Sequence, residues 1–175
     1  GDLFFDDSSN QFFISDGSTA GGVPLVLHYI RNVVSTTADT TLTVAQSGSV
    51  CTGNKADGIT ITLPAAATGL TYAVHVGTTI TSGNFTITAA SSADTMQGQL
   101  ISNDFTDLGS ITLLNESVAT VGFDQPAADD HQIVMDGTTK GGKLGSYVNC
   151  TAITAAIWHV DGFLSSDGSL ATCFT

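Results

Sequence analysis

Two short acidic segments have the side chains best suited to holding a metal ion. Residues 6–10 read DDSSN and residues 129–131 read DDH, and oxygen ligands of this kind suit Ca²⁺. The first segment lacks the alternating acidic spacing and the distal glutamate of an EF-hand loop. Asp and Asn are also common at the tips of hairpins, where they cap their own turns. We therefore expect a hairpin tip and a solvated loop, and no metal ion at either place.

The four histidines are the next candidates for chemistry, and they lie far apart in the sequence. None has another histidine within three to five residues, so no local metal pair forms; they are His28, His75, His131 and His159. Three of them alternate with apolar neighbours, which is typical of the solvent-facing side of a strand.

Motifs that activate a nucleophile or hold a phosphate are missing from the sequence. There is no G-x-S-x-G, no G-x-x-x-x-G-K and no G-x-G-x-x-G. Residues 137–142 (GTTKGG) have a lysine among glycines but the wrong spacing, and we expect a hairpin loop there. Glycoside cleavage by two facing carboxylates stays a weaker alternative, because linear sequence selects no pair among sixteen acids. We expect no catalytic, metal-binding or cofactor-binding residues and no enzyme activity.

Three cysteines allow at most one disulfide within the chain. Cys51, Cys150 and Cys173 are far apart, so there is no C-x-x-C redox or zinc pair. We favour the interpretation that the three cysteines are small apolar residues within a β core. A single disulfide that joins Cys173 to Cys51 or to Cys150 remains the alternative.

The single tryptophan is a candidate either for the core or for stacking on a sugar. Alternation places Trp158 on one side of its strand with Ala156 and Val160, which favours the core. Aromatic residues make up 7% of the chain, which gives little material for carbohydrate recognition.

Composition and charge exclude several classes of partner. The 175-residue chain has four Lys and Arg against sixteen Asp and Glu, for a formal charge of −12. Such a polyanion does not neutralise a phosphate backbone or bind an anionic membrane surface, so we expect no nucleic acid and no membrane as partner. No run approaches the ~18 apolar residues of a membrane helix. Serine and threonine supply roughly a quarter of the residues and most of the polarity.

The elements that must position these residues are strands. Glutamate occurs once and arginine once, whereas Thr, Val, Ile and Phe recur, which disfavours surface helices. Strict alternation appears in residues 58–63 (GITITL), 84–89 (NFTITA) and 70–76 (LTYAVHV), and residues 131–135 form a further strand candidate. We find no internal repeat, and we interpret residues 59–63 and 85–89 as two strands of one kind.

Turn signals separate these runs at short intervals. Asp-Gly occurs five times, at residues 16–17, 57–58, 136–137, 161–162 and 167–168. Asp-Gly suits the positive φ angles of tight hairpin turns, so each pair is a hairpin candidate. The pattern predicts an all-β fold, an antiparallel β-sandwich or barrel built of hairpins.

The N-terminus is predicted to be a separate arm. Residues 3–14 read as a small hairpin with four phenylalanines, and residues 18–22 (STAGG) read as a linker. We therefore place a hairpin arm and linker at residues 1–22 and a sandwich or barrel domain at residues 23–175. An isolated hairpin is marginal in water, so the arm needs a partner surface. Phe4, Phe5, Phe12 and Phe13 are the interface candidates.

Several segments resemble a β-rich module of structural proteins from tailed bacteriophages, especially aquatic ones. They are residues 42–50 (LTVAQSGSV), 54–64 (NKADGITITLP), 69–72 (GLTY), 135–142 (MDGTTKGG) and 158–162 (WHVDG). The opening residues 1–6 (GDLFFD) and 14–17 (ISDG) are similar to segments of phage fibre and head-appendage proteins. The resemblance spans roughly residues 40–175.

The resemblance implies a non-enzymatic protein on the virion surface. It would be a capsid decoration (cement) protein or a head- or tail-fibre domain, usually an oligomer and often a trimer. Its partners would be the major capsid protein, or another virion protein, and further copies of itself. Residues 1–22 would anchor it to the capsid or to a sister subunit. Two other classes stay open: a carbohydrate-binding receptor module, and a filament subunit that polymerises through its N-terminal arm.

Overall fold

The computed structural model describes residues 3–6, 11–15, 17–18, 23–25, 31–104 and 121–175. The chain folds as two compact units, Gly1–Arg31 and Asn32–Thr175. The sequence placed a boundary near residue 22, whereas this division follows Arg31.

The N-terminal unit is a three-stranded antiparallel sheet. Strands β1 (Leu3–Asp6), β2 (Gln11–Ile14) and β3 (Val23–Leu25) are hydrogen-bonded in that order. Leu3 pairs with Ile14 and Asp6 with Gln11, so the predicted N-terminal hairpin is confirmed. Pro24 lies in β3, an edge strand, which is where a sheet tolerates a residue without an N–H group.

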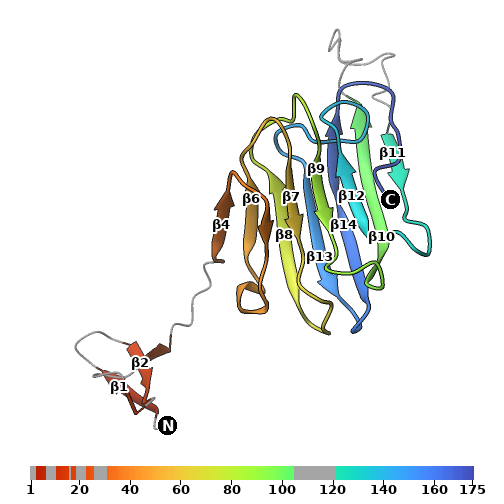
Figure 1. Ribbon diagram of the computed structural model, residues 1–175. Coiled ribbons are helices and arrows are strands. Elements are labelled where there is room, and N and C mark those ends of the chain that lie inside the picture. Colours follow the sequence, from red (N-terminus) through yellow and green to blue (C-terminus); the bar gives the residue numbers. More distant parts are fainter. Residues whose placement is uncertain (1–2, 7–10, 16, 19–22, 26–30, 105–120) are drawn as a thin grey trace, which may run out of the picture. The chain divides into compact units, whose positions relative to one another are not determined.

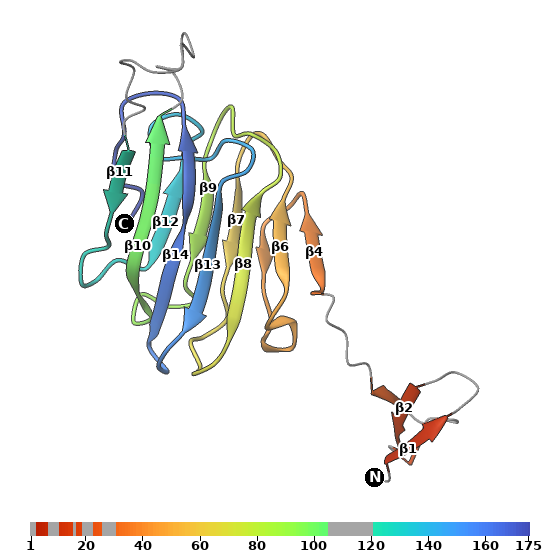
Figure 2. The same cartoon turned by 180° about the vertical axis from the view of Figure 1, so that it is seen from behind.

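The second unit is a sandwich of two sheets, which Figures 1 and 2 show from opposite sides. The seven-stranded sheet has the order β11-β10-β14-β13-β8-β6-β4. Its strands are β4 (Val33–Thr36), β6 (Val50–Gly53), β8 (Thr71–Val76), β10 (Thr95–Asp104), β11 (Val121–Asp124), β13 (Tyr147–Ala152) and β14 (Ile157–Ser166). The four-stranded sheet has the order β12-β9-β7-β5. Its strands are β5 (Thr40–Thr41), β7 (Ile59–Thr62), β9 (Phe85–Thr88) and β12 (Gln132–Met135). A short 3₁₀ helix, Val44–Gln46, lies between β5 and β6, and the described residues contain no α-helix.

The all-β, two-sheet prediction is therefore confirmed, but the antiparallel arrangement built of hairpins is wrong for much of the sandwich. Five strand pairs are parallel: β4–β6, β6–β8, β5–β7, β7–β9 and β10–β14. From β4 to β9 the chain alternates between the sheets, because even-numbered strands lie in the large sheet and odd-numbered ones in the small. When the chain re-enters a sheet after crossing to the other one, it therefore runs parallel to the strand that it last formed there.

This alternation makes β4 to β9 a two-sheet coil, in which the two strands of one kind become neighbours. The similar segments GITITL and NFTITA are β7 and β9, which are parallel neighbours in register. Ile59 lies opposite Phe85, and Ile61 lies opposite Ile87, with all four side chains buried. The resemblance between the two segments therefore reflects equivalent positions in successive turns of the coil.

The Asp-Gly pairs do not close hairpins within the sandwich. Asp57-Gly58 lies in the link that crosses from β6 to β7 in the other sheet, and Gly58 has φ 98°. Asp161-Gly162 lies inside β14. Residues 137–142, predicted to be a hairpin loop, cross from β12 in the small sheet to β13 in the large one. An Asp-Gly pair allows the sharp bend that a positive φ angle requires. It does not determine which of the two sheets the chain enters after the bend.

One apolar layer fills the space between the sheets. Trp158 and Val160 are fully buried, as the alternation of β14 predicts, whereas Ala156 is exposed because it precedes the strand. The Trp158 ring lies 5.9 Å from the ring of Tyr72, between centroids, at a tilt of 54°. The predicted core role of the tryptophan is confirmed.

The three cysteines belong to this same buried layer. Cys51, Cys150 and Cys173 are free thiols with no exposed surface, so the disulfide alternative is not the arrangement in the structure. Burial raises the pKa of Cys51 to about 11, and burial together with the negative charge of Asp161 raises that of Cys150 to about 12. Burial and the nearby Asp124 carboxylate raise the pKa of Cys173 as well.

The parallel register of β7 and β9 is testable by cross-linking. Thr60 lies opposite Thr86 on the outward side, and neighbouring strands about 4.8 Å apart suit a disulfide. We expect the Thr60→Cys/Thr86→Cys double variant to form this bond under mild oxidation, read by mass spectrometry of unreduced peptides. In the Thr62→Cys/Thr86→Cys control the two residues are offset by two positions along the strands and lie roughly 8 Å apart, so no bond should form. Equal yields from both variants would contradict the register.

The buried thiols predict a loss of stability at alkaline pH. The pKa values of the thiols are raised in the folded state. Their contribution to the free energy of unfolding is therefore complete below the ordinary pKa of 9.0, and it is lost as the pH rises towards 11 and 12. Each thiol that ionises only in the unfolded chain lowers the free energy of unfolding by about 1.4 kcal/mol per pH unit. Urea titrations at pH 7, 9 and 10 should give falling midpoints. A Cys150→Ala variant should show a smaller pH dependence, and midpoints that stay constant to pH 10 would exclude this linkage.

Candidate functional site

The phenylalanines predicted to form an interface lie in the first hairpin of the N-terminal unit. In the backbone register of β1 and β2, Phe4 pairs with Phe13 and Phe5 pairs with Phe12. The side chain of Phe4 is 40% exposed. The fold therefore brings the four positions together in one small sheet.

The histidines and the acidic pairs do not converge on one point. His75, His131 and His159 lie on or beside different strands, and His28 is outside the described residues. The acidic segment at residues 7–10 also lies outside them. Among the described residues, no group of three or more His, Cys, Asp or Glu side chains could hold a metal ion. Asp130 accepts a hydrogen bond from the backbone N–H of Ala127 at 2.7 Å and so closes its own loop.

Asp136 shapes the glycine-rich crossing between β12 and β13. Its carboxylate accepts hydrogen bonds from the backbone N–H groups of Thr138 and Lys140 and from the Thr139 hydroxyl, at 2.8 to 2.9 Å. Partial burial by itself raises the pKa of Asp136, but these hydrogen bonds outweigh it and the pKa lies below the ordinary value. The carboxylate is thus occupied by its own loop.

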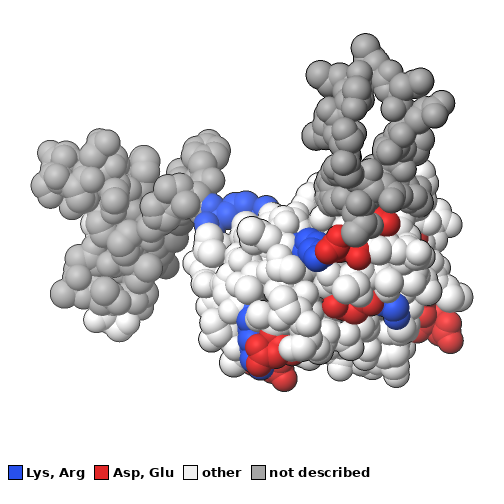
Figure 3. Space-filling model, turned by 90° about the horizontal axis from the view of Figure 1, so that it is seen from above, with Lys and Arg blue, Asp and Glu red and all other residues white. Residues whose placement is uncertain are grey.

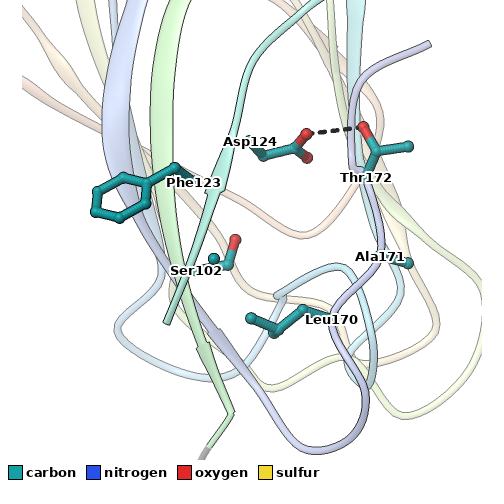
Figure 4. A pocket seen from close by; sticks show the side chains of 7 residues that line it. Ser102, Phe123, Asp124, Leu170, Ala171 and Thr172 are labelled. Atoms are coloured by element: carbon teal, nitrogen blue, oxygen red, sulfur yellow. Dashed lines mark hydrogen bonds between the residues drawn. The ribbon is translucent and has the colours of Figure 1, made fainter. Parts of the chain in front are cut away.

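Asp124 fastens the C-terminal segment, as Figure 4 shows. Its two carboxylate oxygens accept hydrogen bonds from the Thr172 hydroxyl at 2.9 Å and from the Cys173 N–H at 2.6 Å. Beyond this point the C-terminal segment pairs with β12, through Val134 N–H to Cys173 O at 2.8 Å and an isolated bridge between Ile133 and Phe174. The segment thereby covers an edge of the four-stranded sheet.

The segment also encloses a small pocket of about 190 Å³ against β10 and β11. Its lining residues are Ser102, Gly122, Phe123, Asp124, Leu170, Ala171 and Thr172. Asp124 is the charged group among them, and both of its oxygens are already engaged. The carboxylate in this pocket is therefore occupied by the C-terminal segment.

The outer face of the seven-stranded sheet carries a row of largely apolar side chains, here called the apolar row. Register places its members opposite one another across five strands; they are Phe123, Ile101, Phe163, Tyr147 and His75. Phe123 is 65% exposed and Ile101 is 40% exposed. The rings of His75 and Tyr147 stack, with centroids 5.6 Å apart and planes at 22°.

A row of polar side chains lies next to it on the same face. Gln99, Asp161 and Asn149 lie opposite one another on β10, β14 and β13. The Asn149 amide donates a hydrogen bond to the Asp161 carboxylate at 2.9 Å. Gln97, His159 and Thr151 form the following row. Amide, carboxylate, imidazole and hydroxyl groups thus gather on one exposed sheet face.

Between these rows the sheet face is hollowed. The hollow has a volume of about 500 Å³ and is open to solvent; its lining is Gly98, Gln99, Ile101, Gln125, Tyr147, His159, Val160, Asp161 and Gly162. Side chains there offer hydrogen-bond donors and acceptors beside an aromatic ring, which is the composition of a binding site. This hollow is the strongest candidate site in the described part of the chain.

Sequence reasoning did not find this site. Its residues come from strands far apart in the chain, and only the sheet order makes them neighbours. The available signal was alternation, since β13 and β14 each place polar or aromatic residues at every second position.

Charge is thinly spread over this protein. On the face that Figure 3 shows, charged atoms form small groups in a largely uncharged surface. Lys143 pairs with Asp167 at 2.6 Å, and Lys55 lies 3.9 Å from Asp57. Within the described residues, no helix has the length and apolar character needed to span a membrane.

Removing the Asp124 carboxylate should release the C-terminal segment. Asp124→Ala abolishes two hydrogen bonds to a charged acceptor, so we expect a loss of about 3 kcal/mol in the free energy of unfolding. Amide exchange of residues 171–175, followed by mass spectrometry, should become faster. Asp129→Ala, an exposed loop position, serves as the control and should change stability by no more than about 0.5 kcal/mol. Unchanged exchange in Asp124→Ala would refute the fastening role.

Comparison of the chain with models of protein families, with curated proteins and with solved structures finds no match in any of the three.

Proposed function

We propose that this chain is a non-enzymatic structural protein of a virion surface, a capsid decoration (cement) or head-fibre protein. In this proposal the sandwich is displayed on the particle and stabilises it, and the N-terminal unit attaches it to the major capsid protein or to another virion protein. The protein acts as a homo-oligomer, a trimer in the arrangement that the phage resemblance implies.

The observation that carries the proposal is the small N-terminal unit. Gly1–Arg31 forms a compact unit of its own with three short strands. A unit of fewer than about 40 residues rarely holds a sufficient core, and it usually needs disulfides, a metal or association. Residues 1–31 contain no cysteine. We therefore infer that the unit is stabilised by association, with the phenylalanine positions of β1 and β2 as its contact.

The sandwich has properties that suit life on a particle surface. Most of its large apolar residues are buried in one layer between the sheets. Its outward strand positions include many threonines, and the chain carries a net charge of −12. Uncharged hydroxyls and like-charge repulsion between copies disfavour uncontrolled aggregation at high local concentration.

Attachment is tested by adding the full-length protein to virus particles from which this protein is absent. Changing Phe4, Phe5, Phe12 and Phe13 together to Ser should lower occupancy at least ten-fold, because buried aromatic side chains dominate protein interfaces. The control changes Val44 and Leu144 to Ser; these sandwich residues are 60% and 65% exposed, and occupancy should stay at the wild-type level. Occupancy is measured from the protein bound to purified particles. Undiminished binding of the phenylalanine variant would reject the anchoring role.

Light scattering distinguishes this proposal from that of a self-polymerising filament subunit. A closed trimer is the expected result for the isolated protein. Open-ended growth through the N-terminal arm would favour the filament instead.

A further inference from the structure

The hollow on the outer face of β10, β13 and β14 is lined in part by backbone at two glycine positions. Gly98 and Gly162 are both among its lining residues. A Cβ atom on Gly98 would collide with the carbonyl oxygen of Val160, and one on Gly162 would collide with that of Tyr147. Neighbouring backbone therefore restricts both positions to glycine. Both alternate with the outward residues Gln99 and Asp161, so they contribute backbone atoms to the base of the hollow.

The polar side of the hollow is held in place before any ligand arrives. Asn149 donates to Asp161 at 2.9 Å, which fixes the direction of both side chains on an exposed face. Gln99 lies directly opposite Asp161 on the neighbouring strand. His159 lies two residues before Asp161, on the same face. These groups provide both donors and acceptors, so they are able to bind hydroxyl groups, which also do both.

The apolar side of the hollow is equally fixed. Tyr147 and Ile101 line it, and the Tyr147 ring is braced by its stacked contact with His75. A ring with a polar hydroxyl at its tip contacts apolar and polar groups of one ligand at the same time. The matching ligand has C–H faces and hydroxyl edges, which describes a pyranose sugar.

Charge decides which sugars fit. Asp161 is the carboxylate among the lining residues, and Lys and Arg do not occur in the lining. A net charge of −12 also repels anions at a distance. Sialylated, sulfated or phosphorylated ligands are therefore disfavoured. Because the hollow is open on the sheet face, it accepts internal units of a chain as well as a terminal sugar.

We propose that this hollow binds a neutral oligosaccharide, with Asp161 and Gln99 as hydrogen-bonding residues and Tyr147 as the apolar contact. Asn149 positions the Asp161 carboxylate. The site gives the particle-borne sandwich an outward, glycan-binding face. It is independent of the attachment proposed for the N-terminal unit.

The first experiment applies the full-length protein to an array of neutral and anionic glycans, which are the probes. Binding to neutral oligosaccharides is the expected result. An array without hits overturns the proposal, and so does binding restricted to anionic glycans.

The second experiment titrates an array hit into variants by calorimetry. Asp161→Ala and Tyr147→Ala should each weaken binding ten-fold or more, because each removes a contact that orients the sugar. Asp161→Asn keeps the size of the side chain and should retain a native circular dichroism spectrum while still binding more weakly. Thr86→Ala, on the outer face of the other sheet, is the matched control and should bind like the wild type. Wild-type affinity in all three site variants overturns the proposal.

The four-phenylalanine variant separates this proposal from that of attachment. It should bind the same glycan with unchanged affinity even where it no longer occupies particles. Loss of glycan binding in that variant overturns the placement of the site on the sandwich.

Discussion

Burial of one apolar layer between two sheets is the constraint on which the rest of this protein depends. From β4 to β9 the chain meets that constraint by crossing from one sheet to the other after every strand, so that each new turn stacks on the last in parallel. The inward positions of neighbouring turns then coincide, as Ile61 and Ile87 show. The same layer encloses Trp158 and the three thiols, which is why their side chains are dry and unreactive elements of packing.

The edges of a layer of this kind must be covered, and two carboxylates hold the segments beside the edge strand β12. Asp124 holds the C-terminal segment beside β12, and Asp136 organises the crossing that leaves β12. Both acids act on backbone N–H groups that would otherwise lack partners. The acidic composition therefore has two parts: a few engaged carboxylates that set the local structure, and exposed ones that set the net charge. The outer face of the large sheet, which takes no part in these contacts, would then be available for the recognition that we propose.

In the function that we propose, the N-terminal unit attaches the protein and the sandwich binds the glycan. A 31-residue sheet unit is too small to be stable by its own core, so attachment to a partner and its own folding would be coupled. The sandwich needs no such help, and its broad seven-stranded face is an extended surface on which an aromatic residue and polar groups are spaced by the strand repeat. Anchoring and glycan recognition would then lie on separate units and would vary independently.

Alternation within each segment predicted strands of the sandwich and the buried face of Trp158, because the period of two is a local property of the backbone. The N-terminal hairpin was predicted from two phenylalanine-rich runs on either side of a polar segment. Alternation also predicted an all-β sandwich or barrel. It did not predict the parallel coil, since Asp57-Gly58 permits a sharp bend equally well into a hairpin or into the opposite sheet. Nor did it predict the hollow: Gln99, Asn149 and Asp161 become neighbours only because β14 pairs with both β10 and β13. Sequence alone determined what each strand presents on its two sides. Tertiary structure decided which strands meet, because strand order is chosen by packing between residues that are distant in the chain.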